Sequence, residues 1–355
     1  MTPQNDFQQS RLAIFSAVSF YFVAAIAMII ANKWVLNKSN TPLFFLFMQL
    51  LVAVALLFVC RILRILKFPV EVSAAKAKGL IPLVLINVTG LSFNNFTLQL
   101  VDASYYQVAR GLLVPFTVAT SFIFLHSRPS LKVLGACAIV TSGFLVGVLL
   151  DQSYSSFGNS NATLGVTCGL ISTLTTSLHA VVIKRSLDVV NGDTLELAWY
   201  TNLLSALVLV PVIHLAGETP AVYDLMTIVE AAKSDASWTT WQTFLVGTAI
   251  TGLFGFLICI AGFLSIKVTS PVTHMVSSAV RGVFQSVLGI WLFGDIISNG
   301  RWSSIVVIIL GSVYYTYVKN EEAIAKQKSQ GSNGYERVPM NDVESGRRRS
   351  LAAKD

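Results

Sequence analysis

Residues 42–64, PLFFLFMQLLVAVALLFVCRILR, form a long apolar stretch that begins at a proline and ends among basic residues. A helix rises about 1.5 Å per residue, so a stretch of this length crosses roughly 30 Å of hydrocarbon. This segment therefore predicts a membrane-spanning helix.

The rest of the chain has the same character. Its 355 residues are 54% hydrophobic and only 12% charged, and that charged share is about half of what a soluble domain carries. Apolar runs alternate with short polar clusters, which is typical of a polytopic membrane protein. We predict ten spans, at residues 12–32, 42–64, 79–100, 104–125, 131–150, 163–184, 195–216, 241–265, 269–294 and 302–318.

Ten spans divide evenly into two groups of five, which predicts an all-α integral membrane fold built from two inverted repeats. The first repeat covers residues 12–150 and the second covers residues 151–318. Residues 1–11 form a polar cytosolic tail, and residues 319–355 are polar and rich in Gly, Ser and Lys. We expect the latter to be a disordered cytosolic tail.

Basic residues are distributed unevenly between the loops. The loops on one predicted side hold four Lys and Arg, namely Lys33, Lys38, Lys233 and Arg301, whereas the other loops and the two tails together hold 19. The positive-inside rule then places both termini in the cytosol. Because this bias explains most of the net charge of +7, that charge does not indicate a nucleic-acid partner.

Two arginines stand out inside the predicted spans. Arg110 and Arg281 occupy similar motifs, Val-Ala-Arg-Gly-Leu at 108–112 and Ala-Val-Arg-Gly-Val at 279–283, and no Asp or Glu lies inside a span away from its ends. An arginine at a helix centre costs about 2.5–3.5 kcal/mol, so it usually faces a polar cavity and has a partner. With no acidic partner available, we predict that both arginines bind a transported anion.

Polar residues accompany these arginines at helical spacing and predict a hydrated central cavity. The candidate substrate-binding residues are Arg281 with Ser277, Ser278, Thr273 and His274, Arg110 with Tyr106 and Gln107, and Asn94 and Asn95 of the third span. Lys33 joins them because it departs from the charge rule. The alternative is that the small polar residues bond helices together, as they often do in membrane bundles.

Other chemistries lack their sequence signals. The four cysteines, Cys60, Cys137, Cys168 and Cys259, form no CxxC pair or metal-ligand spacing, so we expect no disulfide, metal or cofactor. The spans contain no HExxH, DxxxD or GxSxG motif, which argues against a membrane enzyme. A proton-coupled carrier is disfavoured because proton relays usually need a buried acid.

Several motifs resemble those of the nucleotide-sugar transporters of the drug/metabolite transporter superfamily, with the GDP-fucose transporter branch most similar. The resemblance covers roughly residues 15–318 in collinear order. It rests on Asn32-Lys33, Thr41-Pro42 with Gln49, Phe93-Asn94-Asn95, Tyr106 through Arg110, Trp199-Tyr200-Thr201-Asn202, Gly252 through Phe256, and Thr269 through His274 followed by Arg281.

This resemblance implies a ten-helix Golgi carrier, with the endoplasmic reticulum as the alternative, that exchanges a nucleotide-sugar for a nucleoside monophosphate. It places Tyr200 and Asn202 in a nucleobase-recognition motif and Arg281 at a phosphate contact. Thr201 stands where the motif has Asn, and Arg281 stands where Lys is usual. A UDP-sugar such as UDP-xylose, or a small phosphorylated metabolite, is the alternative substrate.

The pair Gly143 and Gly147 has the small-xxx-small spacing of close helix contact. Packing within the bundle explains the pair, and a homodimer is left as an alternative partner beside the substrate and the lipid bilayer.

Overall fold

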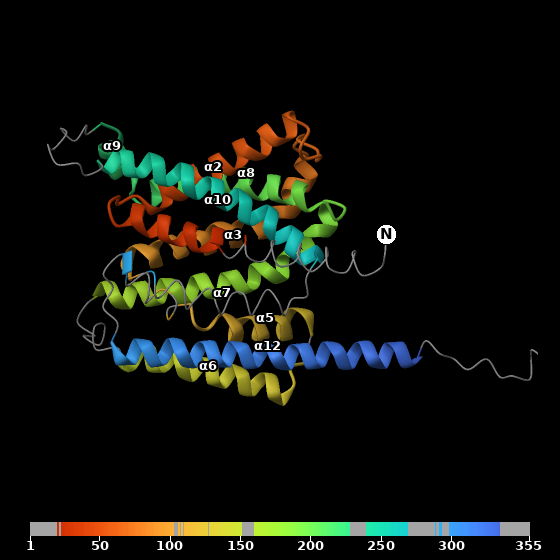
Figure 1. Ribbon diagram of the computed structural model, residues 1–355. Helices are drawn as coiled ribbons and strands as arrows, with labels where there is room; N and C mark the ends of the chain where they lie inside the picture. Colours follow the sequence, from red (N-terminus) through yellow and green to blue (C-terminus); the bar gives the residue numbers. More distant parts are fainter. Residues whose placement is uncertain are drawn as a thin grey trace, which may run out of the picture.

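The computed structural model describes residues 20, 23–102, 106, 108, 110–126, 128–150, 160–227, 239–268, 288, 291–292 and 298–333. Every regular element in this part of the chain is a helix (Figure 1). A helix at Val23–Leu36 is followed by α2 (Pro42–Ile62), α3 (Ala74–Leu100), α5 (Leu113–Leu125), α6 (Leu131–Leu150), α7 (Ser160–Val189), α8 (Thr194–Leu215), α9 (Thr219–Thr227), α10 (Thr240–Val268) and α12 (Asn299–Asn333).

These helices confirm the prediction of an all-helical membrane protein. Within the described residues, seven helices are long and apolar enough to cross a bilayer, and two shorter apolar helices cover Val23–Leu36 and Leu113–Phe124. Most of the predicted span 269–294 lies outside the described residues. The count of ten therefore stays a prediction.

Two helical segments were not expected from the sequence. The short helix α9 lies in the loop after α8, and α12 continues to Asn333, although the tail was predicted to be disordered from residue 319. Two side-chain contacts stabilise the first turn of α12 after the predicted span 302–318. Tyr317 Oη donates to Glu321 at 2.8 Å, and Lys319 pairs with Glu322 at 2.8 Å. Such pairs at helical spacing stabilise a solvated helix end.

The helices pack in pairs and small groups (Figure 1). In the described part of the chain, α6 runs along α12, α3 runs along α7, and α2 packs against both α8 and α10. The first helix also lies against α10, where Gly247 faces Val35 and Gly255 faces Met28.

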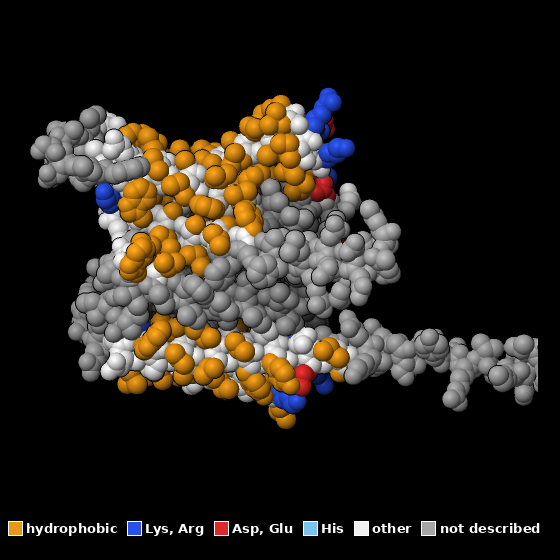
Figure 2. Space-filling view, in the orientation of Figure 1, with side chains coloured by type: hydrophobic (Ala, Val, Ile, Leu, Met, Phe, Trp, Pro, Cys, Tyr) orange, Lys and Arg blue, Asp and Glu red, His pale blue; other side chains and the backbone are white. Residues whose placement is uncertain are grey.

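The outer face is apolar. In Figure 2 hydrophobic side chains cover the visible face along the described helices, and charged side chains lie near the helix ends. Large residues on these faces, such as Leu131 and Phe122, are exposed. Exposed apolar faces of this extent fit contact with lipid rather than with water.

The α6–α12 contact is close because glycines face the partner helix. A Cβ added to Gly143 would lie 2.9 Å from the backbone nitrogen of Ile308, and one added to Gly147 would meet the side chain of Ser304. Gly311 of α12 faces Val140 of α6. The small-xxx-small pair predicted from sequence therefore packs within the bundle.

A buried acid holds the start of α2. Gly217, with φ of +75°, follows α8 in the left-handed conformation and turns the chain. The next residue, Glu218, accepts hydrogen bonds from the backbone nitrogens of Leu43 and Phe44 at 3.0–3.1 Å. A carboxylate at a helix N-terminus accepts hydrogen bonds from the free N–H groups and interacts favourably with the helix dipole. Glu218 therefore fixes the loop after α8 to the start of α2.

Replacing Gly143 with leucine should disrupt the α6–α12 contact. The added side chain meets the α12 backbone, which cannot move aside, so we expect a loss of about 1–3 kcal/mol in stability and a lower thermal unfolding temperature of the purified protein in detergent. Gly135→Leu is the matched control, because a Cβ at Gly135 of the same helix meets nothing within 4 Å. Equal unfolding temperatures for the two variants would contradict this account of the contact.

Candidate functional site

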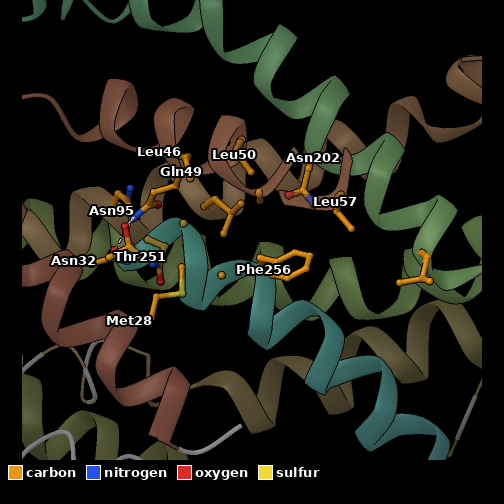
Figure 3. Close-up of a pocket in the computed structure, with 16 residues that line it drawn as sticks. Met28, Asn32, Leu46, Gln49, Leu50, Leu57, Asn95, Asn202, Thr251 and Phe256 are labelled. Atoms are coloured by element: carbon orange, nitrogen blue, oxygen red, sulfur yellow. Dashed lines mark hydrogen bonds between the residues drawn. The ribbon is translucent and has the colours of Figure 1, made fainter. Parts of the chain in front are cut away.

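A pocket lies between the first helix, α2, α3, α8 and α10 (Figure 3). Six of its described lining residues are polar and none is charged. The polar residues are Asn32, Gln49, Asn94, Asn95, Asn202 and Thr251. Leucines, Met28, Ala53, two glycines and Phe256 supply the remaining walls.

Gln49 is at the centre of the polar side of this pocket. Its Nε2 donates to Asn32 Oδ1 at 2.7 Å and to Thr251 Oγ1 at 2.8 Å. The three residues are buried and come from three helices. A buried amide is costly unless it is hydrogen-bonded, so this contact fixes the three helices relative to each other.

The pocket side chains of α3 and α8 are held through their amide nitrogens. Asn95 Nδ2 donates to the backbone oxygen of Pro42 at 3.2 Å, which ties α3 to the start of α2. Asn202 Nδ2 donates to the backbone oxygen of Ala198 in its own helix at 2.9 Å. Both side chains are therefore oriented before any ligand binds.

A chain of hydrogen bonds connects Arg110 to the pocket. Arg110 Nη1 donates to Tyr106 Oη at 2.7 Å, and Tyr106 Oη donates to Asn94 Oδ1 at 2.5 Å. The guanidinium carbon also lies 5.5 Å from the centre of the Tyr106 ring. Arg110 Nη2 reaches Thr176 Oγ1 of α7 at 3.4 Å. The sequence placed Arg110, Tyr106 and Asn94 in one site, and the structure brings them together.

All the hydrogen-bond partners of the Arg110 guanidinium in the described part of the chain are hydroxyl groups. Its Nε is buried and has no hydrogen-bond partner there. Hydroxyl groups and a tyrosine ring orient the cation without neutralising it, since none of them carries a full negative charge. Arg110 can therefore attract an anion to this side of the pocket.

Lys33, a substrate-binding candidate from the sequence, contacts the end of α3. Its side chain is buried, and its Nζ donates to the backbone oxygens of Leu98 and Val101 at 2.8 and 2.6 Å. These carbonyls end α3, where a cation is favoured by the helix dipole. Lys33 is not among the described residues that line the pocket.

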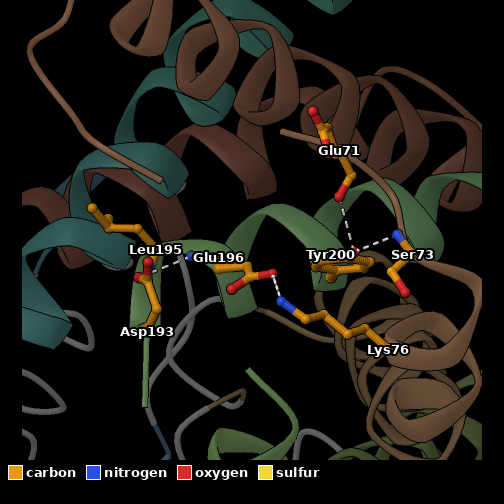
Figure 4. Close-up of polar contacts among 7 residues, drawn as sticks. All are labelled: Glu71, Ser73, Lys76, Asp193, Leu195, Glu196 and Tyr200. Atoms are coloured by element: carbon orange, nitrogen blue, oxygen red, sulfur yellow. Dashed lines mark hydrogen bonds and ion pairs between the residues drawn. The ribbon is translucent and has the colours of Figure 1, made fainter. Parts of the chain in front are cut away.

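Tyr200 is not among the described residues that line the pocket, and Figure 4 shows its polar contacts. Its ring is fully buried, and its Oη accepts from the backbone nitrogen of Ser73 at 2.7 Å and donates to the backbone oxygen of Glu71 at 3.1 Å. Beside it, Lys76 and Glu196 form an ion pair at 2.6 Å. These contacts join the start of α8 to the segment that leads into α3.

The motif at 199–202 is therefore divided between two faces of α8. Residues two apart on a helix point in different directions, so Asn202 lines the pocket while Tyr200 packs against the neighbouring loop. Thr201, the departure from the family motif, donates to the backbone oxygen of Leu197 at 2.7 Å and is not among the lining residues.

Six predicted site residues lie outside the described residues: Arg281, Ser277, Ser278, Thr273, His274 and Gln107. Conversely, three polar lining residues were not selected from the sequence, namely Asn32, Gln49 and Thr251. Their signal was an isolated polar residue within an apolar stretch, which is visible at Gln49 in residues 42–64.

Comparison with known proteins gives a consistent result. Residues 12–316 match the model of the Triose-phosphate Transporter family. The chain is 30% identical over 333 residues to "GDP-fucose transporter 1" of Monosiga brevicollis, which covers 91% of this chain and 95% of the relative.

It is 29% identical over 334 residues to "GDP-fucose transporter, Golgi" of Drosophila melanogaster, which covers 90% of this chain and 94% of the relative. A solved crystal structure with 14% identity and a TM-score of 0.51 covers 85% of this chain and 96% of its own, and it shows likeness of fold alone.

Tyr106→Phe tests the link between Arg110 and Asn94. Removing the hydroxyl leaves the half-buried donor of Arg110 and the half-buried acceptor of Asn94 without their partner, so we expect a stability loss of about 1 kcal/mol. Thermal unfolding in detergent measures it. The control is Tyr315→Phe, which removes a hydroxyl with no hydrogen bond in the described part of α12. If both variants unfold at the wild-type temperature, the hydrogen-bond chain does not stabilise the fold.

Proposed function

This chain belongs to the Triose-phosphate Transporter family, and on that premise we propose that it carries a nucleotide-sugar across the Golgi membrane in exchange for a nucleoside monophosphate. GDP-fucose or a close analogue is the favoured substrate, because relatives that align over nearly the whole chain are GDP-fucose transporters by name. The fold would be complete with ten helices in two inverted repeats, and both termini would face the cytosol.

The observation that carries the proposal is Arg110, whose charge the described residues do not neutralise, connected to a pocket lined by amides. A nucleotide-sugar has two matching parts. Its diphosphate is anionic and suits the fork of an arginine, whereas its base and sugar are neutral and offer many hydrogen-bonding groups. A neutral polar pocket beside a cation suits such a molecule.

The helix pairing supports two inverted repeats. If residues 12–150 and 151–318 are related by a two-fold axis, α2 corresponds to α8 and α6 corresponds to α12. These corresponding helices pack against each other, as helices near such an axis must.

The other contacts come in matching pairs. α3 with α7 corresponds to α10 with the first helix, and α2 with α10 corresponds to α8 with α3. Repeats that exchange roles across a central site are the usual basis of alternating access, which supports an exchange mechanism.

In the proposed site Arg281 is the counterpart of Arg110 in the second repeat and contacts the phosphates. Ser277, Ser278, Thr273 and His274 share its predicted helix face, and Gln107 accompanies Arg110. Each arginine would approach the substrate from its own half, so that the anion is held as the halves rock about it. Asn202 would contribute to base recognition from α8.

Transport by purified protein in liposomes tests the proposal. Vesicles preloaded with GMP should take up labelled GDP-fucose, and vesicles without an internal nucleotide should take up much less. Parallel panels with UMP and UDP-sugars, and with phosphate and triose phosphate, test the alternative substrates. Absence of exchange with every panel member would exclude the proposed function.

Arg281→Ala should lower GDP-fucose exchange at least about tenfold, because charge-assisted hydrogen bonds contribute about 1.5–3 kcal/mol each. Arg110→Ala should lower it in the same direction, and the initial rate of exchange at equal protein density is the measurement. Lys132→Ala is the control, since this exposed lysine at the start of α6 pairs with Glu321 near the helix ends. Exchange by Arg281→Ala at the rate of Lys132→Ala would show that Arg281 does not bind substrate.

A further inference from the structure

The pocket contains five amide side chains, and the structure determines which end of each one is left for a ligand. An amide offers one acceptor oxygen and one NH₂ group that only donates. When its protein partner can only accept or only donate, the orientation of the amide is fixed. The same holds when the partner is a hydroxyl or a second amide whose own role as donor or acceptor is already fixed by its other hydrogen bonds. One of these two conditions applies to each of the five amides in this pocket.

Asn95 and Asn202 present oxygen to the pocket. Their partners, the backbone oxygens of Pro42 and Ala198, can only accept. Each NH₂ group therefore directs one of its two N–H bonds to the protein. The Oδ1 atoms of both residues make no hydrogen bond within the described part of the chain.

Gln49 presents oxygen as well. The Thr251 hydroxyl donates its proton to the backbone oxygen of Gly247 at 2.7 Å, so it accepts from Gln49 Nε2. The second hydrogen of Nε2 goes to Asn32 Oδ1. Both donors of Gln49 are thereby used, while its Oε1 has no partner among the described residues.

The remaining two amides present NH₂ groups. Tyr106 Oη receives a hydrogen bond from the Arg110 guanidinium, which can only donate, so the tyrosine proton goes to Asn94 Oδ1. Asn32 Oδ1 accepts from Gln49. The Nδ2 groups of Asn94 and Asn32 are left as donors.

The pocket thus offers three acceptor oxygens, from α2, α3 and α8, and Gln49 is left with an acceptor only, since both of its N–H groups are used. Gln49 and Asn95 are 6% and 2% exposed, so their orientation is held by packing as well as by hydrogen bonds. Phe256 and several leucines form apolar walls beside them. Apolar walls with a polar edge suit a flat heterocycle better than a sugar, whose hydroxyl groups point in all directions.

We infer that Gln49 and Asn95 determine nucleobase choice and select guanine. This inference rests on the proposed function. The hydrogen-bonding edge of guanine carries two neighbouring donors, N1–H and the 2-amino group, beside one acceptor, O6. Uracil carries a single donor between two acceptors. The acceptor oxygens of Gln49 and Asn95 can therefore pair with both donors of guanine, whereas uracil leaves at least one of these oxygens without a donor.

Competition against labelled GMP exchange in liposomes tests the inference, with unlabelled GMP, IMP and UMP as probes. IMP differs from GMP only in lacking the 2-amino group of the base. For the wild-type protein we expect GMP to compete better than IMP, and UMP to compete least. Loss of one neutral hydrogen bond changes affinity about three- to tenfold, which sets the expected spacing.

Two substitutions at one position separate base recognition from folding. Asn95→Leu removes the acceptor, whereas Asn95→Asp keeps it, and both lose the bond to Pro42. We expect the ratio of UMP to GMP inhibition constants to fall about three- to tenfold in Asn95→Leu and to stay near wild type in Asn95→Asp. The pair Gln49→Met and Gln49→Glu repeats the comparison on α2 where an Asn95 variant does not fold.

Thr201→Val is the control, because it removes a hydrogen bond within α8 at a residue that does not line the pocket. Its ratio should equal that of wild type. The inference is overturned if UMP competes as well as GMP with the wild-type protein, or if the Leu and Asp variants have the same ratio. Failure of all three nucleotides to compete would overturn the proposed function itself and the inference with it.

Discussion

The interior of a bilayer contains no water to bind a free amide or hydroxyl, so polar groups there must satisfy one another. The contact of Gln49 with Asn32 and Thr251 is the clearest result of this constraint. It joins three helices at one buried point and orients the side chains around the pocket. Because each donor of Gln49 has a definite acceptor, the same contact that holds the bundle together also decides what the pocket offers to a ligand.

The cation is held by a different arrangement. Arg110 is fixed by Tyr106 and Thr176 without an acidic partner among the described residues, so it is oriented but keeps its full charge. The Tyr106 hydroxyl receives a bond from Arg110 and gives one to Asn94, which links the charged part of the site to the neutral part. An anion bound near Arg110 would change the polarisation of the hydrogen bonds from Arg110 through Tyr106 to Asn94, and Asn94 lines the pocket.

Tight helix contacts support the site from outside. The glycines of α6 and α12 allow two backbones to approach closely, which is a main source of stability where the hydrophobic effect does not drive helix association. Glu218 and Lys33 each bind backbone groups at a helix end, and Tyr200 binds the segment before α3. These buried polar residues therefore fix helix ends, while the pocket residues lie between them.

The sequence by itself determined the helical class, the approximate bounds of most spans and the family, because hydropathy over twenty residues and motif order are local properties. It also placed Arg110, Tyr106 and Asn94 in one site, because Arg110 and Tyr106 lie in one predicted span and Asn94 belongs to a family motif. Only the tertiary structure decided which partner each single polar residue contacts.

Tyr200 and Asn202 are two positions apart, yet one packs against a loop and the other lines the pocket. Gln49 lies far from Thr251 in the sequence, and only the folded bundle brings it into contact with Asn32 and Thr251 of two other helices. The reason is physical: a polar residue in a span always needs a partner, but its sequence does not say whether that partner is a helix end, another side chain or a ligand.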